Sequence, residues 1–343
     1  MEKLPLGKLP KNVLIENVLS FSYVKDDVLL PPSYGEDGAV VRTKGNLIIA
    51  AADPITGASE EAGWLSVHVN ANDIAVHAAY PKWYIVTLLF PENTMVDDIE
   101  KVMKGIRRAL NEIDGSLIGG HTEITNKVND IIIAGTMIGE PIIPGEYITS
   151  SGAKVGDDIV LTKGAGIEGT FILATDFENE LRKRIDEQII DNAKRFREKI
   201  SILPEVQIIT ENVDIEHIHA MHDVTEGGLI GGVFEIAYAS NLSFRIYEEK
   251  VPILEPTEEI CKFYHIDPLK LIGSGALLIS VDSEISDEVI NALNKAGIYA
   301  ATIGKFEKRW DHIGVLVRKN GDEHIIDEPP IDELWRLLGL MSI

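Results

Sequence analysis

The sequence predicts an α/β (α+β) protein built from two domains of similar size. Its 343 residues, 45% hydrophobic and 25% charged, are ordinary for a globular chain and sufficient for two separate cores. Short apolar runs alternate with longer segments of helical periodicity, which is typical of mixed α/β domains. A stretch rich in Pro, Gly and Ser, PIIPGEYITSSGAKVGDD, predicts a linker between the two series.

The first domain is predicted to span residues 35–149, after an N-terminal arm of residues 1–34. Two predicted strands surround the turn Lys44-Gly45-Asn46 and should pair with each other. The predicted strands are residues 38–42, 47–51, 83–90, 116–118 and 131–138, and the predicted helices are residues 60–79 and 95–113.

The second domain is predicted to span residues 150–330, followed by a helical tail of residues 331–343 that is helical from Asp332 to Leu340. Its predicted strands are residues 159–162 and 276–281 and a final pair around Val315 and His324. Its predicted helices are roughly residues 171–200, 228–240 and 287–296.

Charge and composition exclude several classes of function. The 55 acidic and 32 basic residues give a net charge of -23, which repels nucleic acid backbones. An anionic substrate would need a local cation, and a bound divalent metal is the simplest one. The one cysteine, Cys261, excludes an intramolecular disulfide and a Cys-based zinc site. We expect a cytoplasmic protein without a membrane segment, because neither a signal core nor about 18 consecutive apolar residues are found.

Four acidic or amide-bearing segments in the first domain are interpreted as turns at the ends of apolar elements. They are Gly35-Glu36-Asp37-Gly38, Ala51-Ala52-Asp53-Pro54, Asn72-Asp73 and Gly119-Gly120-His121-Thr122-Glu123. Carboxylates next to glycines at strand ends are suitable ligands for Mg²⁺, which binds oxygen atoms and substrate phosphates. Taken singly, each also has an ordinary explanation as a turn residue or a solvated carboxylate.

Asp73 is the most informative of these residues, because it lies in a segment with the pattern of a buried helix. The apolar residues Leu65, Val69 and Val76 recur at helical spacing, and Asn70, Asn72 and Asp73 interrupt them. A carboxylate on such a helix is costly unless it is paired, hydrogen-bonded or bound to a metal. A metal-binding role and an internal hydrogen bond both satisfy this requirement.

Two glycine-containing motifs stand out in the second domain. Gly164, Gly166 and Gly169 spell the G-x-G-x-x-G fingerprint of dinucleotide-binding proteins, but the following thirty residues are predicted to be helical and include no second strand. The alternative is that these glycines allow tight packing between the strand and the helix, or a phosphate contact at the helix N-terminus. The motif HDVTEGGL at 222–229 places Asp223 and Glu226 before a helix, with a capping box at Thr225 as the structural alternative. The sequence has no Walker P-loop, H-E-x-x-H or G-x-S-x-G motif.

Seven motifs follow one another along nearly the whole chain. They are GEDGAVV (35–41), AAD (51–53), NANDIAVHAAYP (70–81), GGHTE (119–123), VGDDIVLTKGAGIEGT (155–170), AMHDVTEGGL (220–229) and DPLKLIGSGALLIS (267–280). In this order they resemble the PurM/HypE superfamily, which includes aminoimidazole ribonucleotide synthetase, selenophosphate synthetase, thiamine monophosphate kinase and HypE. The pattern is most similar to HypE.

The resemblance implies a two-domain PurM-like fold that forms a homodimer, with the N-terminal sheets meeting as a barrel and ATP bound with Mg²⁺. It implies catalytic roles for Asp73, Asp223 and Glu226. The implied metal ligands are Asp37, Asp53, Asp73, Glu123 and Asp223. The implied nucleotide-binding residues are Asp37, Asp53, Asn72, Gly119, Gly120, His121, Thr122 and Glu123. Gly164 and Gly166 are added to them, because their turn could contact a phosphate at the helix N-terminus.

The sequence also departs from the family pattern. HypE ends in a cysteine that carries a carbamoyl group, whereas this chain ends Leu340-Met-Ser-Ile343, so we expect that it cannot carry a thiocarbamate in cis. GKLPKNVL replaces the glycine-rich stretch usual near the start of HypE. His121 stands where several members have an acid, so either Glu123 supplies the charge or fewer metal ions bind.

We therefore predict a Mg²⁺-dependent enzyme that uses ATP to phosphorylate an oxygen of an unassigned small-molecule or protein acceptor. One alternative is an ATP-binding partner protein without catalysis, which would act through its surface. The other is an NAD-dependent dehydrogenase, based on Gly164 to Gly169.

Overall fold

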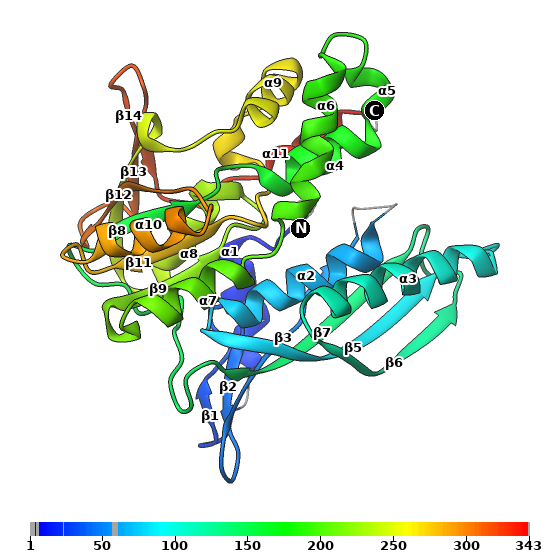
Figure 1. Cartoon of the computed structure of the whole chain (residues 1–343), viewed down its shortest axis with the longest axis horizontal. Coiled ribbons are helices and arrows are strands. Elements are labelled where there is room, and N and C mark those ends of the chain that lie inside the picture. Colours follow the sequence, from blue (N-terminus) through cyan, green and yellow to red (C-terminus); the bar gives the residue numbers. More distant parts are fainter. Residues whose placement is uncertain (1–3, 5–6, 23, 57–60, 342–343) are drawn as a thin grey trace. The chain divides into compact units, whose positions relative to one another are not determined.

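The computed structural model describes residues 4, 7–22, 24–56 and 61–341, and it divides the chain into two compact units (Figure 1). The smaller unit contains Lys25–Pro31 and Asp37–Tyr147, and the larger unit contains Met1–Val24, Pro32–Glu36 and Ile148–Ile343. Each unit has its own sheet and helices, so the predicted α/β class is confirmed. Within the described residues, no helix combines the length and apolar character needed to cross a bilayer.

The sheet of the smaller unit has the order β1-β2-β3-β7-β5-β6, and the short strand β4 pairs with β7. The pair β5–β6 is parallel and the other pairs are antiparallel. Ala39 lies opposite Ala50, which confirms the predicted hairpin. The sheet is open in the single chain, with β1 and β6 at its ends. The strands are β1 (Val28–Leu30), β2 (Ala39–Arg42), β3 (Leu47–Ala51), β4 (Pro54–Ile55), β5 (Ala79–Phe90), β6 (Ser116–Ile124) and β7 (Ile132–Pro141).

Two helices, α2 (Ala62–Ala75) and α3 (Val96–Glu112), lie side by side on one face of this sheet (Figure 1). They approach closely because Gly63 has no Cβ, which would lie 2.2 Å from the carbonyl oxygen of Val102. All residues of α2 are buried, whereas α3 buries only one stripe. Helix α2 ends earlier than predicted because Ala78 has a left-handed φ of 55° and β5 begins at the next residue. Glu60, the predicted helix start, lies outside the described residues.

The motif GGHTE was predicted to be a turn, and this prediction is wrong, because residues 119–123 lie inside strand β6. The backbone of these residues forms the hydrogen bonds of a parallel strand pair with β5. Gly120 lies so close to β5 that a Cβ would be 2.0 Å from the carbonyl oxygen of Val86. Here glycine permits close strand contact and does not form a turn.

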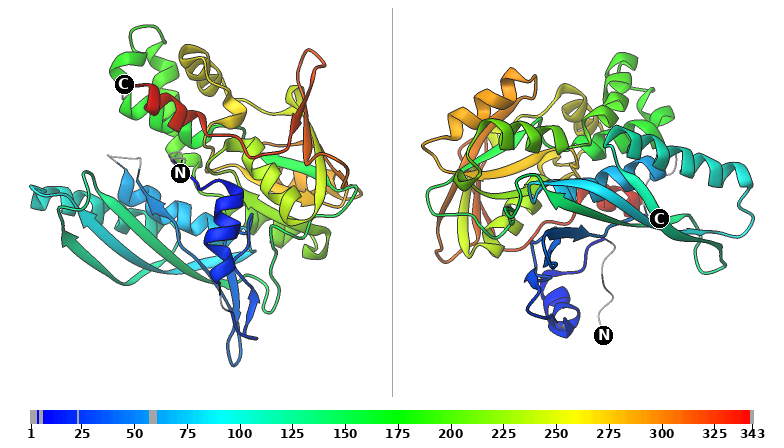
Figure 2. Two further views of the ribbon diagram at one scale, coloured as in Figure 1. Left: turned by 180° about the vertical axis from the view of Figure 1, so that it is seen from behind. Right: turned by 60° about the horizontal axis from the view of Figure 1, so that its bottom comes forward.

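The larger unit has a seven-stranded sheet with the order β14-β13-β10-β12-β8-β11-β9. Figure 2 shows this unit in two further views. Strand β11 lies between β8 and β9 and is antiparallel to both, so β8 and β9 run in the same direction. Strands β9, β10 and β12 were not predicted from the sequence. The strands are β8 (Asp158–Thr162), β9 (Ile218–Asp223), β10 (Leu242–Tyr247), β11 (Leu277–Val281), β12 (Ala300–Lys308), β13 (Gly314–Val317) and β14 (Glu323–Ile326).

Helices cover both faces of this sheet, which is why β8 and β11 are buried along their whole length. Helix α8 packs on the face that carries Ile159, Phe244 and Leu278 in a single apolar cluster. Helix α10 contacts α7, β8 and β12. The helices of this unit are α1 (Lys11–Asn17), α4 (Ile167–Asp176), α5 (Glu178–Leu181), α6 (Glu187–Lys194), α7 (Leu203–Asn212), α8 (Gly228–Ala239), α9 (Glu255–Tyr264), α10 (Ser286–Lys295) and α11 (Glu333–Met341).

Candidate functional site

Polar side chains in and directly after α2 contact the acidic turns of the smaller unit. Asn70 and Asp73 are spaced at i and i+3 on one side of the helix, and His77 lies in the turn that follows it. The Asn70 side chain accepts a hydrogen bond from the Asp53 backbone N–H at 2.9 Å and donates one to the Asp53 carbonyl at 3.0 Å. This face of the helix therefore holds the turn that carries Asp53.

The turn that follows α2 contacts the turn that carries Asp37. Gly38 lies against His77, and a Cβ on Gly38 would be only 2.9 Å from His77 Nε2. Asp73 is 5% exposed and lies between Asn70 and His77 in the sequence. The segment that carries this buried acid therefore contacts both acidic turns.

The pairing of β2 with β3 brings Asp37 and Asp53 to one end of a hairpin. Asp37 precedes β2 by two residues and Asp53 follows β3 by two, and Ala39 lies opposite Ala50 in the register. Strand register thus places these two carboxylates at the same edge. Asp37, Asp53 and Asp73, three of the five predicted metal ligands, therefore lie on neighbouring segments of the smaller unit.

Glu123 is not brought to this group within the chain. It lies on the edge strand β6, and β7 and β5 separate β6 from β3. Three strand spacings correspond to about 14 Å. Its carboxylate lies 3.1 Å from His121 Nε2, and both side chains are exposed. Among the other predicted nucleotide-binding residues, Gly119, Gly120 and Thr122 belong to the same exposed strand. Asn72 lies in α2 and is fully buried.

Three glycine-containing turns meet at one edge of the sheet in the larger unit. The ends of β8 and β9 and the start of β11 lie at this edge. A Cβ on Gly273 would be 3.3 Å from the Gly166 nitrogen and 2.9 Å from Val224 Cγ1. The Val224 N–H also donates to the Ala276 carbonyl at 3.0 Å. The predicted residues Gly164 and Gly166 thus lie in a turn next to the end of β9, where Asp223 is the last residue.

Lys163 ties these turns together from inside the unit. Its Nζ lies 2.6 Å from Glu205 Oε1 and donates to the carbonyl oxygens of Lys199, Ser201 and Gly275 at 2.7–2.9 Å. Burial lowers the pKa of Lys163 and raises the pKa of Glu205, and their ion pair opposes both shifts. The ammonium group therefore serves as a structural link between chain segments.

The G-x-G-x-x-G fingerprint has a packing role in this structure. Gly166 precedes α4 with a left-handed φ of 68°, and a Cβ on Gly169 would be 2.4 Å from Leu271 Cγ. Helices follow α4, and the next strand, β9, begins only at Ile218. Moreover, β11 lies between β8 and β9. This is not the adjacent βαβ unit that a dinucleotide fingerprint requires.

The HDVTEGG turn is held by ionic and backbone contacts. His222 and Asp223 are buried at the end of β9, and His222 Nε2 lies 2.8 Å from Glu235 Oε2. The Glu226 carboxylate accepts the Lys8 backbone N–H at 2.7 Å. The capping box considered for Thr225 is wrong, because the residue that precedes α8 is Gly227, with a φ of 90°.

Glu235 remains ionised despite its burial. Burial alone would raise its pKa, but the Lys8 ammonium at 3.4 Å and the hydrogen bond with His222 outweigh this effect and lower the pKa to about 2. The segment at Lys8 is therefore attached to the same turn through both its backbone and its side chain.

Asp332 fixes the opposite side of this turn. Its carboxylate accepts the Gly227 N–H at 2.7 Å and the Leu334 N–H at 2.8 Å. Burial raises the pKa of Asp332 to about 6, although these backbone hydrogen bonds oppose the shift. The segment that leads into α11 is therefore a structural support of the HDVTEGG turn.

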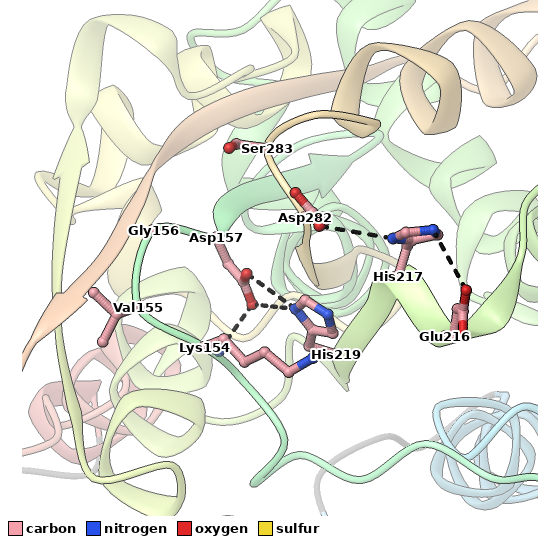
Figure 3. Close-up of a pocket in the computed structure, with 9 residues that line it drawn as sticks. All are labelled: Lys154, Val155, Gly156, Asp157, Glu216, His217, His219, Asp282 and Ser283. Carbon is pink, nitrogen blue, oxygen red and sulfur yellow. Dashed lines mark hydrogen bonds and ion pairs between the residues drawn. The ribbon is translucent and has the colours of Figure 1, made fainter.

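A cavity of about 450 Å³ lies near the starts of β8 and β9, at the other end of the sheet from the glycine turns (Figure 3). His219 Nδ1 lies 2.8 Å from Asp157 Oδ2, and His217 Nδ1 lies 3.7 Å from Asp282 Oδ2. Asp157 also accepts a hydrogen bond from the Ser280 hydroxyl at 2.6 Å. Each imidazole faces its own carboxylate, so these pairs do not surround a common metal position.

Asn70 and Glu235 were not predicted from the sequence as residues that position the acidic turns. Both are polar side chains inside otherwise apolar helices, which is the same signal that identified Asp73. Their partners, Asp53 and His222, are distant along the chain or lie on an unpredicted strand. The signal could therefore have identified the residues but not their partners.

Two family models match the chain. The model described as AIR synthase related protein, N-terminal domain, matches residues 35–140, and the corresponding C-terminal domain model matches residues 154–317. The chain belongs to the AIR synthase related family. The resemblance inferred from the seven motifs is thereby confirmed.

Several AIR synthase related relatives match most of the chain. A Methanocaldococcus jannaschii protein assigned to hydrogenase expression and formation is 28% identical and aligns with 97% of this chain and 96% of its own. Carbamoyl dehydratase HypE of Rhizobium leguminosarum bv. viciae is 25% identical, with coverage of 88% and 86%. Selenide, water dikinase of Methanocaldococcus jannaschii is 26% identical, with coverage of 90% and 91%.

Solved structures confirm the two-domain fold. The HypE-HypF complex matches with a TM-score of 0.75 and 22% identity over 92% of this chain and 99% of the other. HypE in complex with ATP matches with a TM-score of 0.70 and 20% identity over 96% and 98%. AaThiL complexed with AMPPCP and TMP matches with a TM-score of 0.72 and 20% identity over 96% and 99%.

Replacing Lys163 should strongly destabilise the larger unit. Lys163→Met leaves Glu205 buried without its counter-charge, which should cost about 3–5 kcal/mol. Urea unfolding should show this loss. Lys305→Met is the matched control, since the Lys305–Asp158 pair at 3.0 Å involves a lysine side chain that is 57% exposed, and it should lose less than about 1 kcal/mol. Equal losses in both variants would contradict a structural role for the buried pair.

Asp332 should make the free energy of unfolding depend on pH. Its folded pKa of about 6 lies above the ordinary value of 3.8, so the folded state binds more protons between these values and stability falls as pH rises from about 4 to 6. Asp332→Asn should remove about 2–3 kcal/mol of this fall. Urea unfolding at pH 4.5 and pH 7 measures the effect, and an unchanged pH dependence in the variant would refute it.

Proposed function

We propose that this protein is a Mg²⁺-dependent enzyme that binds ATP and phosphorylates an oxygen atom of its acceptor. The observation that carries the proposal is the position of Asp73 on α2, between Asn70, which contacts the Asp53 turn, and His77, which follows the helix and contacts the Asp37 turn. One of the matching HypE structures is a complex with ATP, and the relatives include a dikinase and a carbamoyl dehydratase. These similarities support a nucleotide substrate for this chain.

The chemistry of the residues fits magnesium. Asp37, Asp53 and Asp73 offer carboxylate oxygens, which are the ligands that Mg²⁺ prefers, and Asp73 is a buried acid that benefits from a cation. Bound Mg²⁺ would neutralise charge on the phosphates of ATP. The carboxylates of this chain would bind and orient the metal–nucleotide complex, and the helix and hairpin would keep them in register.

Positioning and charge neutralisation are the main requirements of phosphoryl transfer, because its transition state is loose and needs little covalent chemistry from the protein. A site made of carboxylates can therefore replace a P-loop, which this sequence lacks. Asp223 and Glu226 are retained as proposed catalytic residues of the larger unit. Gly164 and Gly166 are proposed to contact phosphate through their backbone.

The proposed function predicts that Asp73→Asn separates nucleotide binding from folding. The variant keeps the shape of the side chain but removes its charge, so the affinity for Mg²⁺-ATP should fall about 10-fold or more. Isothermal titration with Mg²⁺-ATP measures this affinity, and ADP release in the presence of candidate acceptors tests for turnover.

Asp97→Asn is the matched control for this change, because it removes the same charge from an exposed position on α3. It should leave nucleotide affinity unchanged. A large loss of thermal stability in Asp73→Asn with unchanged nucleotide affinity would contradict the binding role. ATP binding without turnover under any condition would instead favour a non-catalytic partner protein.

We also propose that two copies associate through β6. This strand lies at the end of the sheet and exposes Leu117, Ile118 and Ile124, which are 41–53% exposed. An exposed apolar edge strand with unpaired backbone groups favours association with another chain. Association of two such sheets would also give the barrel implied by the family resemblance.

Ile118→Lys should convert the dimer to a monomer, because it places a charge in the proposed apolar interface. Light scattering coupled to size-exclusion chromatography at micromolar concentration measures the mass. Val155→Lys is the control, since Val155 is 61% exposed and lies in the larger unit. A monomeric wild-type protein, or a dimer unaffected by Ile118→Lys, would contradict the proposal.

A further inference from the structure

Both polar atoms of the Asn70 side chain form hydrogen bonds with the backbone of Asp53. Asn70 Oδ1 accepts the Asp53 N–H at 2.9 Å, and Asn70 Nδ2 donates to the Asp53 carbonyl at 3.0 Å. That carbonyl also accepts the Gly135 N–H at 3.1 Å. The backbone of Asp53 is therefore held on both sides by α2 and β7.

The Asn70 side chain is closely surrounded by neighbouring atoms. Asn70 is fully buried, and its Nδ2 also donates to the Ser66 carbonyl at 2.8 Å, so its amide uses both polar atoms. A Cβ on Gly135 would lie 2.6 Å from Asn70 Nδ2 and 2.4 Å from the Tyr84 hydroxyl. Glycine at 135 is thus required for the amide to reach Asp53.

This contact matters because Asp53 lies in a short, partly exposed connection. Only Ala52 and Asp53 separate β3 from β4, and Pro54 follows directly. Proline restricts the preceding residue to extended conformations, and the two hydrogen bonds of Asn70 select one of them. Fixing the Asp53 backbone fixes the direction in which its side chain leaves the chain.

We infer that Asn70 is a positioning residue that holds the carboxylate of Asp53 in place for the metal–nucleotide complex. This inference rests on the proposed function, in which Asp53 is a metal ligand. Both hydrogen bonds between Asn70 and Asp53 involve backbone atoms of Asp53 and neither involves its carboxylate oxygens. Residues that orient metal ligands in this way typically change metal affinity about 10- to 100-fold when they are replaced.

The test compares Asn70→Ala with Ser66→Ala in the full chain. Ser66 is buried on the same helix, and its hydroxyl donates to the Gly63 carbonyl at 2.9 Å, so its removal costs a buried hydrogen bond without an Asp53 contact. The readout is the Mg²⁺ concentration that gives half-maximal binding of the ATP analogue AMPPCP. It should rise about 10-fold or more in Asn70→Ala and stay within about 2-fold of wild type in Ser66→Ala.

Coupling to Asp53 is tested by a double-mutant cycle. If Asn70 acts through the Asp53 carboxylate, Asn70→Ala should add little to the effect of Asp53→Asn. Additive effects of the two changes would overturn the positioning role. An equal Mg²⁺ shift in Asn70→Ala and Ser66→Ala would also overturn it, because a general loss of stability would then explain both.

Hydrogen exchange provides a readout that needs no nucleotide. The Asp53 amide proton is bonded to Asn70, so its exchange should accelerate in Asn70→Ala and not in Ser66→Ala. An unchanged exchange rate would overturn the contact itself. A wild-type protein that binds no AMPPCP at any Mg²⁺ concentration would overturn the proposed function and, with it, the role of Asn70. Normal wild-type binding with an unshifted Asn70→Ala would overturn only the role of Asn70.

Discussion

A helix that is buried along its whole length needs partners for the polar side chains that it carries, and Asn70 of α2 finds them in the backbone of Asp53 and Ser66. All fourteen of its residues are buried, including Asn70 and Asp73. An unsatisfied buried amide costs about 1–3 kcal/mol, so the contacts of Asn70 are as necessary to the fold as apolar packing. The same contacts hold the Asp53 turn. Folding and construction of the candidate site therefore depend on the same hydrogen bonds.

The larger unit meets the same constraint with charged groups. Glu235 on α8 is buried and ionised, and Lys8 and His222 supply its partners. Lys163 and Glu205 form a second buried pair whose ammonium also binds three carbonyl oxygens. These groups hold the glycine turns and the HDVTEGG turn at one edge of the sheet. A rigid edge is required if backbone N–H groups are to bind a phosphate, because a mobile turn would have to be ordered on binding.

Local patterns in the sequence predicted the elements whose stability is local. The β2–β3 hairpin and helices α3, α8 and α10 have clear periodicity and turn residues, and the structure contains them. Strand β9 was unassigned because it is buried throughout most of its length and carries His and Asp at its end, so it lacks the alternation of a half-buried strand. The GGHTE segment was assigned to a turn because its glycines are typical of turns. Its parallel pairing with β5 is a long-range contact that overrides this preference.

The sequence predicted those residues of the candidate site whose burial in an apolar segment would be costly without a partner. A carboxylate in an apolar helix identified Asp73, and the order of the motifs supported Asp37 and Asp53. The partner of Asn70 lies 17 residues earlier in the sequence, and no spacing rule connects the two. Likewise, the distance of Glu123 from the other acids follows from the strand order, in which β7 and β5 intervene. Strand order depends on the whole sheet and is not encoded in a single segment.

The two ways of positioning acids have different electrostatic consequences. In the larger unit, Lys8 neutralises part of the charge of Glu235, so the carboxylate of Glu235 has a structural role. In the smaller unit, a neutral amide and a glycine N–H fix Asp53 through backbone atoms, and these bonds use no carboxylate oxygen. A divalent cation bound by such a carboxylate would be the largest charge in its surroundings. In a chain with a net charge of -23, the proposed function therefore requires that ATP bind together with its metal, because the bare anion would be repelled.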